Sequence, residues 1–238
     1  MNPNIFHFIF LFLLIGCLAG FLAGLLGIGG GIVMVPLFFW AFKSLDFGEH
    51  SFHIAIATSL SVIMWATLSG AITHELKRWV DRLALPYLAI GGVIGVLAGS
   101  SLASILKGST LEVLFSALLF AVALQLLLDN SHPMLDKPIS KSPLTLLLFG
   151  LASGLTSAFF GIGGGVVLVP ILVLSRYPLH LAIGTSTANA FIIATFGTIA
   201  YIYHGHGILD RPPNCLGFIY WPATIVVAIP AIIFARLG

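Results

Sequence analysis

The sequence predicts an all-α integral membrane protein built from two homologous, inverted repeats. Composition is the first reason: of the 238 residues, 59% are hydrophobic and only 8% are charged, whereas a soluble domain has about 25% charged residues. Mean hydropathy is +1.11. The other two reasons are uncharged segments too long for one membrane crossing and a motif that occurs twice. Long, continuous apolar runs favour helices over a membrane β-barrel, whose strands alternate.

Charge and cysteine content exclude several other classes of protein. The net charge is only +2 and no tract is rich in lysine and arginine, so nucleic acid is not an expected partner. The two cysteines, Cys17 and Cys215, are too few for a disulfide framework and are expected to be packing residues. The N-terminus resembles a signal peptide, but it lacks a basic region and its apolar run continues. We therefore expect the first helix to remain in the protein.

The first element is a helical hairpin over residues 5–42, broken by the GIGGG sequence at 27–31. This run contains no Asp, Glu, Lys or Arg over 38 residues. As one helix it would measure about 57 Å at about 1.5 Å per residue, against a hydrocarbon core of about 30 Å. The glycines are the only helix breakers in its middle. The same reasoning predicts a second hairpin over 144–175, broken by GIGGG at 161–165.

The remaining segments complete the two repeats, residues 1–130 and residues 143–238, which a polar linker at 131–142 joins. Helices are expected at 53–71, 83–106 and 111–128 in the first repeat, and at 179–203 and 214–235 in the second. The second repeat has no counterpart of 111–128. We therefore expect 7–8 membrane segments, with the eighth segment absent from this sequence.

Three matches in the same order support the repeats. Residues 27–36 match residues 161–170 at eight of ten positions, HIAIATS at 53–59 matches HLAIGTS at 180–186, and an Asp-Arg pair follows a span in each half. Internal repeats are typical of secondary transporters, with a binding site near the membrane midplane. If each broken run is a hairpin, seven of the ten basic residues fall on one side of the membrane; if each run crosses once, only six do. The positive-inside rule then favours hairpins, inverted repeats and an N-terminus outside the cytoplasm.

The doubled G-I-G-G-G-x-x-x-V-P motif, each copy followed by A-I-x-T-S, resembles the sulfite exporter TauE/SafE family, and the resemblance covers nearly the whole chain. The resemblance implies a bacterial inner-membrane permease that carries small sulfur-containing anions: sulfite, thiosulfate, sulfonates or sulfoacetate. Such a protein has no cofactor, and its partners are the anion, a coupling ion such as a proton, and the bilayer. The sequence leaves the oligomeric state open.

The glycine triplets are the first candidate substrate contacts: Gly29, Gly30 and Gly31 in one break, and Gly163, Gly164 and Gly165 in the other. Backbone amides at a helix start have no helical partner, and the helix dipole adds positive charge there. No lysine or arginine lies inside a predicted span, so bare amides are the groups available for an anion. The alternative is that the glycines only permit a tight turn between packed helices.

Hydroxyl and amide side chains in the second motif are the other candidate substrate contacts: Thr58, Ser59, Thr185, Ser186 and Asn189. The alternative for the hydroxyls is bonding to the preceding helical turn. His74 and His204 lie at the C-terminal ends of their spans and are candidates for proton transfer or gating. His53 and His180 lie at the starts of their spans and are expected at the membrane interface. The pair His204 and His206 lacks further ligands, so no metal is expected.

The sequence thus predicts a secondary transporter or exporter of a small sulfur-containing anion, with sulfite first, that works by alternating access around the two glycine breaks. The alternative function is an anion channel of the same architecture. An enzyme is not expected, because no carboxylate is positioned to orient a serine–histidine pair at membrane depth. The basic residues Lys77, Arg78 and Arg82 either set topology or gather anions at one mouth.

Overall fold

The computed structural model describes residues 3–26, 30–128, 142–208 and 212–235, and almost all of them lie in helices. The described helices are α1 (Pro3–Leu26), α2 (Gly31–Ser44), α3 (Ser51–Leu76), α4 (Leu85–Ile105), α5 (Gly108–Leu128), α6 (Pro143–Phe160), α7 (Gly165–Leu174), α8 (Leu179–His204) and α9 (Trp221–Phe234). A 3-10 turn, Gly48–His50, precedes α3, and β1 (Cys215–Leu216) pairs antiparallel with β2 (Ile219–Tyr220). The predicted all-α membrane fold is confirmed.

Four of these helices, α3, α4, α6 and α8, are long and apolar enough to cross a membrane. Shorter apolar helices accompany them, including α2, α7 and α9. Large apolar side chains face outward, for example Ile90 and Ile94 on α4, which are about half exposed. Such a surface is unfavourable in water but matches the bilayer hydrocarbon. The protein is a multi-pass membrane protein.

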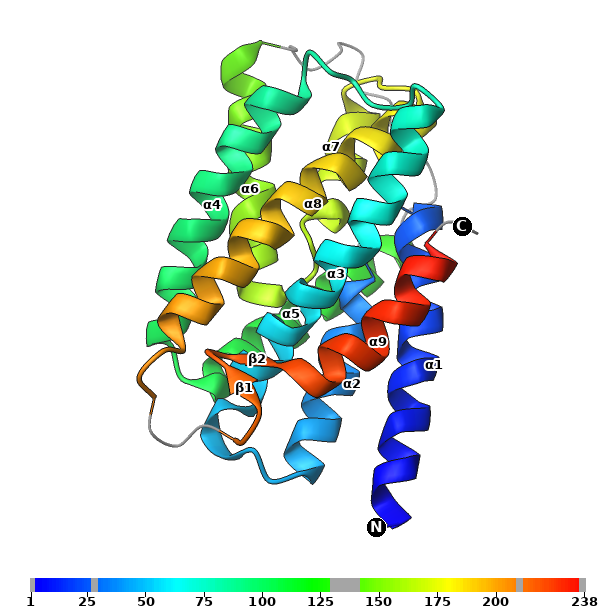
Figure 1. Ribbon diagram of the computed structural model, residues 1–238. Helices are drawn as coiled ribbons and strands as arrows, with labels where there is room; N and C mark the ends of the chain where they lie inside the picture. Colours follow the sequence, from blue (N-terminus) through cyan, green and yellow to red (C-terminus); the bar gives the residue numbers. More distant parts are fainter. Residues whose placement is uncertain (1–2, 27–29, 129–141, 209–211, 236–238) are drawn as a thin grey trace.

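Each glycine break separates two helices that run in opposite directions, as the hairpin prediction requires. In Figure 1, α1 rises from the N-terminus and α2 returns, whereas α6 descends and α7 returns upward. The helices α2 and α7 have 14 and 10 residues, or about 21 Å and about 15 Å. Neither crosses a hydrocarbon core of about 30 Å alone. The opposite directions of the two hairpins support inverted repeats.

Helices from the two halves pack closely against each other at pairs of glycines. Gly150 and Gly154 of α6 lie so close to α4 that a Cβ on either would overlap an α4 backbone oxygen. Gly16 and Gly20 of α1 lie equally close to the backbone of α9. Small residues four apart permit this approach of membrane helices. One helix of each pair comes from each half, so the halves interlock.

The predicted helix at 214–235 is the clearest difference between sequence and structure. Residues 215–220 form the short hairpin of β1 and β2, and α9 begins only at Trp221. Asn214 and Gly217 have positive φ angles of 67° and 59°, which end regular structure, and Pro222 stands in the first turn of α9, where proline is well tolerated. Helix α3 instead runs beyond the predicted 53–71, to Leu76. Most of the predicted linker lies outside the described residues.

Candidate substrate site at the glycine breaks

The two glycine breaks meet inside the protein. A Cβ on Gly31, at the start of α2, would overlap the carbonyl oxygen of Gly161 in the second break. On the other side of that break, a Cβ on Gly163 would lie 2.9 Å from the Ile63 side chain of α3 and 3.7 Å from Ala190 of α8. The second break therefore lies between elements of both halves. Gly29 lies outside the described residues.

Glycine is required at these turns because of their backbone conformation. Gly30, Gly161, Gly163 and Gly164 have φ angles of 72°, 64°, 70° and 76°, a region that costs other residues about 1–2 kcal/mol. Gly30 and Gly164 cap α2 and α7, and neither helix has a side-chain cap. The first backbone amides of both helices therefore have no acceptor within the helix, and they lie at the positive ends of the helix dipoles.

Two serines hold the second break by its carbonyl oxygens. The hydroxyl of Ser59 donates to Gly161 O at 2.8 Å, and that of Ser153 donates to Gly164 O at 3.1 Å. Both serines are fully buried. The Ser59 hydroxyl hydrogen is thus engaged by the break itself, whereas the prediction assigned this side chain to substrate. Ser153 was missed because its counterpart in the first half is Ala19, and the search for repeats highlights positions that recur.

Thr58 and Thr185 make matched contacts across the halves. Thr58 Oγ1 accepts a hydrogen bond from the amide of Tyr220 at 3.1 Å, and Thr185 Oγ1 accepts one from the amide of Asp81 at 2.9 Å. Each amide belongs to the connection after the long helix of the other half. Both hydroxyls are fully buried. The repeated threonines therefore anchor the connections that precede α9 and α4.

Replacing Thr185 with valine should destabilise the protein by about 1–2 kcal/mol, because the Asp81 amide loses its acceptor and stays partly buried. Thr185→Ser, which keeps the hydroxyl, is the matched control. Thermal unfolding of the purified protein in detergent measures the difference. A valine variant that melts with the serine variant and the parent would show that this bond does not anchor the connection.

Asn189 is the strongest candidate for substrate contact. It is fully buried, and among the described residues neither its Oδ1 nor its Nδ2 has a hydrogen-bond partner. The amide faces α4, where a Cβ on Gly92 would lie 3.4 Å from Oδ1. The Ser157 hydroxyl of α6 is also buried and without a partner in the described part of the chain. Burying an unsatisfied polar group costs about 1–3 kcal/mol, which a polar ligand would offset.

The two unsatisfied groups named above, Asn189 and Ser157, both belong to the second half. Asn189 and Ser157 correspond to Val62 and Ala23 of the first half, so the two repeats differ at both positions. Ser157 was missed for the same reason as Ser153. The other predicted residue, Ser186, is buried on α8 one turn before Asn189.

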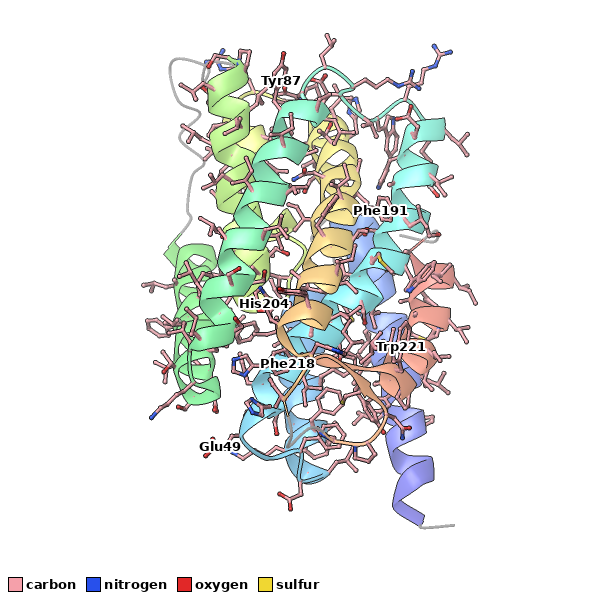
Figure 2. The ribbon with its side chains drawn as sticks, turned by 60° about the vertical axis from the view of Figure 1, so that its left-hand side comes forward. Glu49, Tyr87, Phe191, His204, Phe218 and Trp221 are labelled. Atoms are coloured by element: carbon pink, nitrogen blue, oxygen red, sulfur yellow. The ribbon has the colours of Figure 1, made fainter. Side chains whose placement is uncertain are left out.

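The two predicted titrating histidines lie away from the breaks. His74 lies in the last turn of α3, is buried, stacks on Trp79 with ring centroids 5.7 Å apart, and has no hydrogen bond from either ring nitrogen to a described residue. His204 ends α8, and its Nε2 lies 3.2 Å from the hydroxyl of Ser101. Since α3 and α8 run in opposite directions, the histidines lie toward opposite ends; Figure 2 places His204 toward the end that carries Glu49.

The basic cluster after α3 is partly neutralised. Arg82 donates to the Glu75 carboxylate, with Nε at 2.7 Å, and Lys77 lies over the Trp79 ring at 4.7 Å. A cavity of about 570 Å³ there is lined by Glu75, Arg78, Val80, Asp81, Arg82 and Leu181. Both acidic and basic groups line it, so it is not the uniformly positive funnel that the three basic residues suggest by themselves.

Comparison with known proteins agrees with this architecture. The family model "Sulfite exporter TauE/SafE" matches residues 12–238. A probable membrane transporter protein of Haemophilus influenzae is 30% identical over 237 residues, which is 98% of this chain and 89% of that protein. Probable membrane transporter proteins of Methanocaldococcus jannaschii (26% identical; 96% of this chain, 84% of that protein) and Xylella fastidiosa (33% identical; 78% of this chain, 70% of that protein) are also similar. No solved structure matches the chain.

Proposed function

This chain belongs to the TauE/SafE sulfite exporter family of membrane transporters, and we propose that it moves a small sulfur-containing anion by alternating access around its paired glycine breaks. Sulfite is the first candidate, and sulfonates, sulfoacetate and thiosulfate are the others. The resemblance seen in the sequence is confirmed at the level of the family and of membrane transport. The substrate, the mechanism, the bacterial inner-membrane location, the outward N-terminus and the absence of catalysis belong to this proposal.

The unsatisfied amide of Asn189 is the observation that carries the proposal. An anion site needs hydrogen-bond donors, and the lysines and arginines of the described residues fall near helix ends or in connections. An Asn Nδ2 supplies two donors, Ser157 supplies one, and the first amides of α7 supply positive partial charge. A neutral site of this kind binds an anion without a buried positive charge, which is costly in hydrocarbon.

Alternating access requires a site at the boundary between two bodies that rock against each other. The breaks occupy such a boundary, because Gly31 of the first half abuts Gly161 of the second and Ser59 of the first half binds the same residue. Rocking of one half against the other would create a space beside Asn189 that opens to either side of the membrane. His74 and His204, near opposite ends of the protein, would serve as the carriers of a coupled proton.

Transport by the purified protein in liposomes is the direct test. We expect saturable uptake of labelled sulfite that is accelerated by unlabelled sulfite inside the vesicles, since a carrier exchanges its substrate. Sulfate, thiosulfate and an organosulfonate offered in turn define the class. Unsaturable, voltage-driven sulfite currents would instead indicate the channel, and failure to transport any of the four anions would show that the substrate class is wrong.

A further inference from the structure

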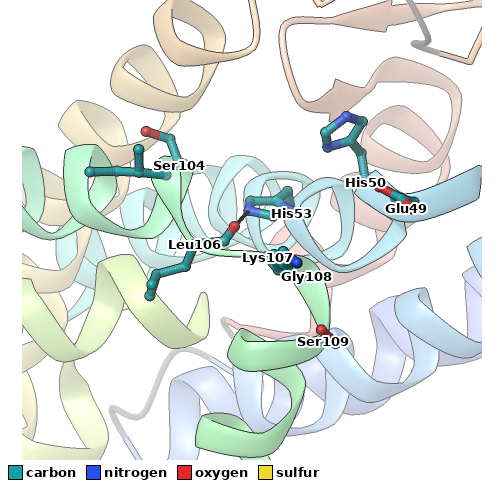
Figure 3. A pocket seen from close by; sticks show the side chains of 9 residues that line it. Glu49, His50, His53, Ser104, Leu106, Lys107, Gly108 and Ser109 are labelled. Carbon is teal, nitrogen blue, oxygen red and sulfur yellow. Dashed lines mark hydrogen bonds between the residues drawn. The ribbon is translucent and has the colours of Figure 1, made fainter.

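A second polar cavity, whose lining includes no glycine of the two breaks, lies where α3 begins, α4 ends and α5 begins. Its volume is about 450 Å³, large enough for a small ligand. Figure 3 shows the segment from Ser104 to Ser109 on one side and Glu49, His50 and His53 on the other. No part of the proposed transport site contributes to its wall.

His53 lines this cavity, and its Nδ1 is buried without a hydrogen-bond partner among the described residues. Its side chain is only 3% exposed, so neighbouring residues cover it although it stands in the first turn of α3. Nε2 lies 3.2 Å from Ala103 O and 3.1 Å from Leu106 O. Carbonyl oxygens only accept, so Nε2 carries the hydrogen. Burial disfavours the charged ring; in the neutral ring Nδ1 carries a lone pair, for which the described residues offer no partner.

The direction of this lone pair is determined by packing. The ring stacks on Phe218, with centroids 5.2 Å apart and planes 22° apart. The carbonyl oxygens of Ala103 and Leu106 fix the position of Nε2. Nδ1 then faces the first residue of α5, 3.8 Å from where a Cβ on Gly108 would lie. A ligand that satisfies Nδ1 must therefore bring a hydrogen-bond donor to the N-terminus of α5.

The same cavity contains groups that can bind an anion. The first helical bonds of α5 are donated by Thr110 and Leu111 to Lys107 O, so the amides of Gly108 and Ser109 precede them and lie at the positive end of a 21-residue helix. The Lys107 side chain is exposed at the wall. The other charged or titratable groups lining the cavity are Glu49 and His50. The Glu49 carboxylate opposes an anion, so its removal should strengthen binding.

We propose that this cavity binds a small, singly charged oxyanion that carries an O–H group, such as dihydrogen phosphate or hydrogen sulfite. The anionic oxygens bind Lys107 and the first amides of α5, and the O–H donates to His53 Nδ1. Binding does not depend on the glycine breaks. Only its use in transport, as a second anion site near one end of the protein, rests on the proposed function.

Equilibrium dialysis of the full-length protein in nanodiscs against labelled inorganic phosphate at slightly acidic pH tests the proposal. We expect saturable binding that Lys107→Gln weakens about tenfold and Glu49→Gln strengthens severalfold, because charge-assisted hydrogen bonds of this kind are worth about 1.5–3 kcal/mol. Lys107→Arg, which keeps the charge, should bind within about threefold of the parent. Thermal unfolding of each variant shows that it is folded.

Competing ligands separate the possible sources of the oxyanion. Sulfite should displace phosphate, whereas dimethyl phosphate and glycerophosphocholine, which have a phosphate charge but no phosphate O–H, should displace it at least tenfold less well. Equal displacement by these diesters would mean that a lipid headgroup fits as well and would overturn the proposed ligand. No saturable binding, or binding unchanged by Lys107→Gln, would overturn the site.

One further variant separates this proposal from the transport site. Phosphate binding should persist in Asn189→Leu, which changes the glycine-break site alone. If Asn189→Leu abolishes phosphate binding, the anion occupies the central site and the cavity proposal is wrong. If binding persists in a parent that transports no sulfur anion, the cavity proposal stands and the proposed function fails.

Discussion

Replacing Asn189 with leucine is expected to abolish transport while leaving the protein at least as stable as the parent. The amide is fully buried and unsatisfied among the described residues, so an apolar side chain of similar size removes a polar group that costs about 1–3 kcal/mol in the empty protein. The same change removes two donors from the proposed anion site. We expect the transport rate at low substrate to fall at least about 100-fold, equivalent to about 2.7 kcal/mol.

Opposite effects on stability and transport make this substitution diagnostic. Sulfite uptake into liposomes and thermal unfolding in detergent measure the two properties on the same preparation. Thr195→Val is the matched control, because Thr195 lies on the same helix and its hydroxyl donates to Phe191 O of the preceding turn. The control should transport normally. Parental transport by Asn189→Leu would show that Asn189 does not bind the substrate, and a clear loss of stability would show that its amide is satisfied in the folded protein.

Gly164→Ala should destabilise the protein by about 2–5 kcal/mol and thereby remove transport. The residue has a φ of 76°, and a Cβ there would overlap the hydroxyl of Ser153. The left-handed backbone costs alanine about 1–2 kcal/mol, and overpacking adds about 1–3 kcal/mol. Thermal unfolding and liposome uptake provide the measurements.

Gly48→Ala serves as a control that has the backbone strain without a steric clash. Gly48 has a similar φ of 68° but nothing within 4 Å of its Cβ position, so this variant should show the strain alone, about 1–2 kcal/mol. Adding Ser153→Gly to Gly164→Ala should recover part of the loss, because the two side chains then no longer collide. If Gly164→Ala and Gly48→Ala lose equal stability, the second break is not tightly packed.

Much of the fold could be predicted because the relevant signals are local. A run of 38 uncharged residues at 5–42 must bend in a bilayer, and the glycines clustered at 27–31 are the strongest break near its middle. The start of α9 could not be predicted in this way. Residues 214–220 are apolar enough to continue a helix, but the positive φ angles of Asn214 and Gly217 turn the chain so that Tyr220 reaches Thr58.

The candidate site could be predicted only in part. The repeated residues Gly30, Gly164, Thr58 and Thr185 were found because they recur, and the structure places each at a contact that glycine or threonine is suited to make. Ser157 does not recur, and nothing in the sequence distinguishes it from the other hydroxyls of α6. Its significance depends on its burial without a partner in the described structure.

The sequence by itself determined that this protein is a helical membrane transporter of the TauE/SafE family, with two glycine-broken hairpins, because hydropathy, length and motif are properties of contiguous residues. The tertiary structure alone decided which polar groups are engaged. Ser59 forms a hydrogen bond with Gly161, 102 residues away, and Thr185 forms one with Asp81, 104 residues away. The Asn189 side chain forms no hydrogen bond with a described residue. These outcomes depend on which faces of distant helices pack together, and the spacing of residues along one helix does not determine that.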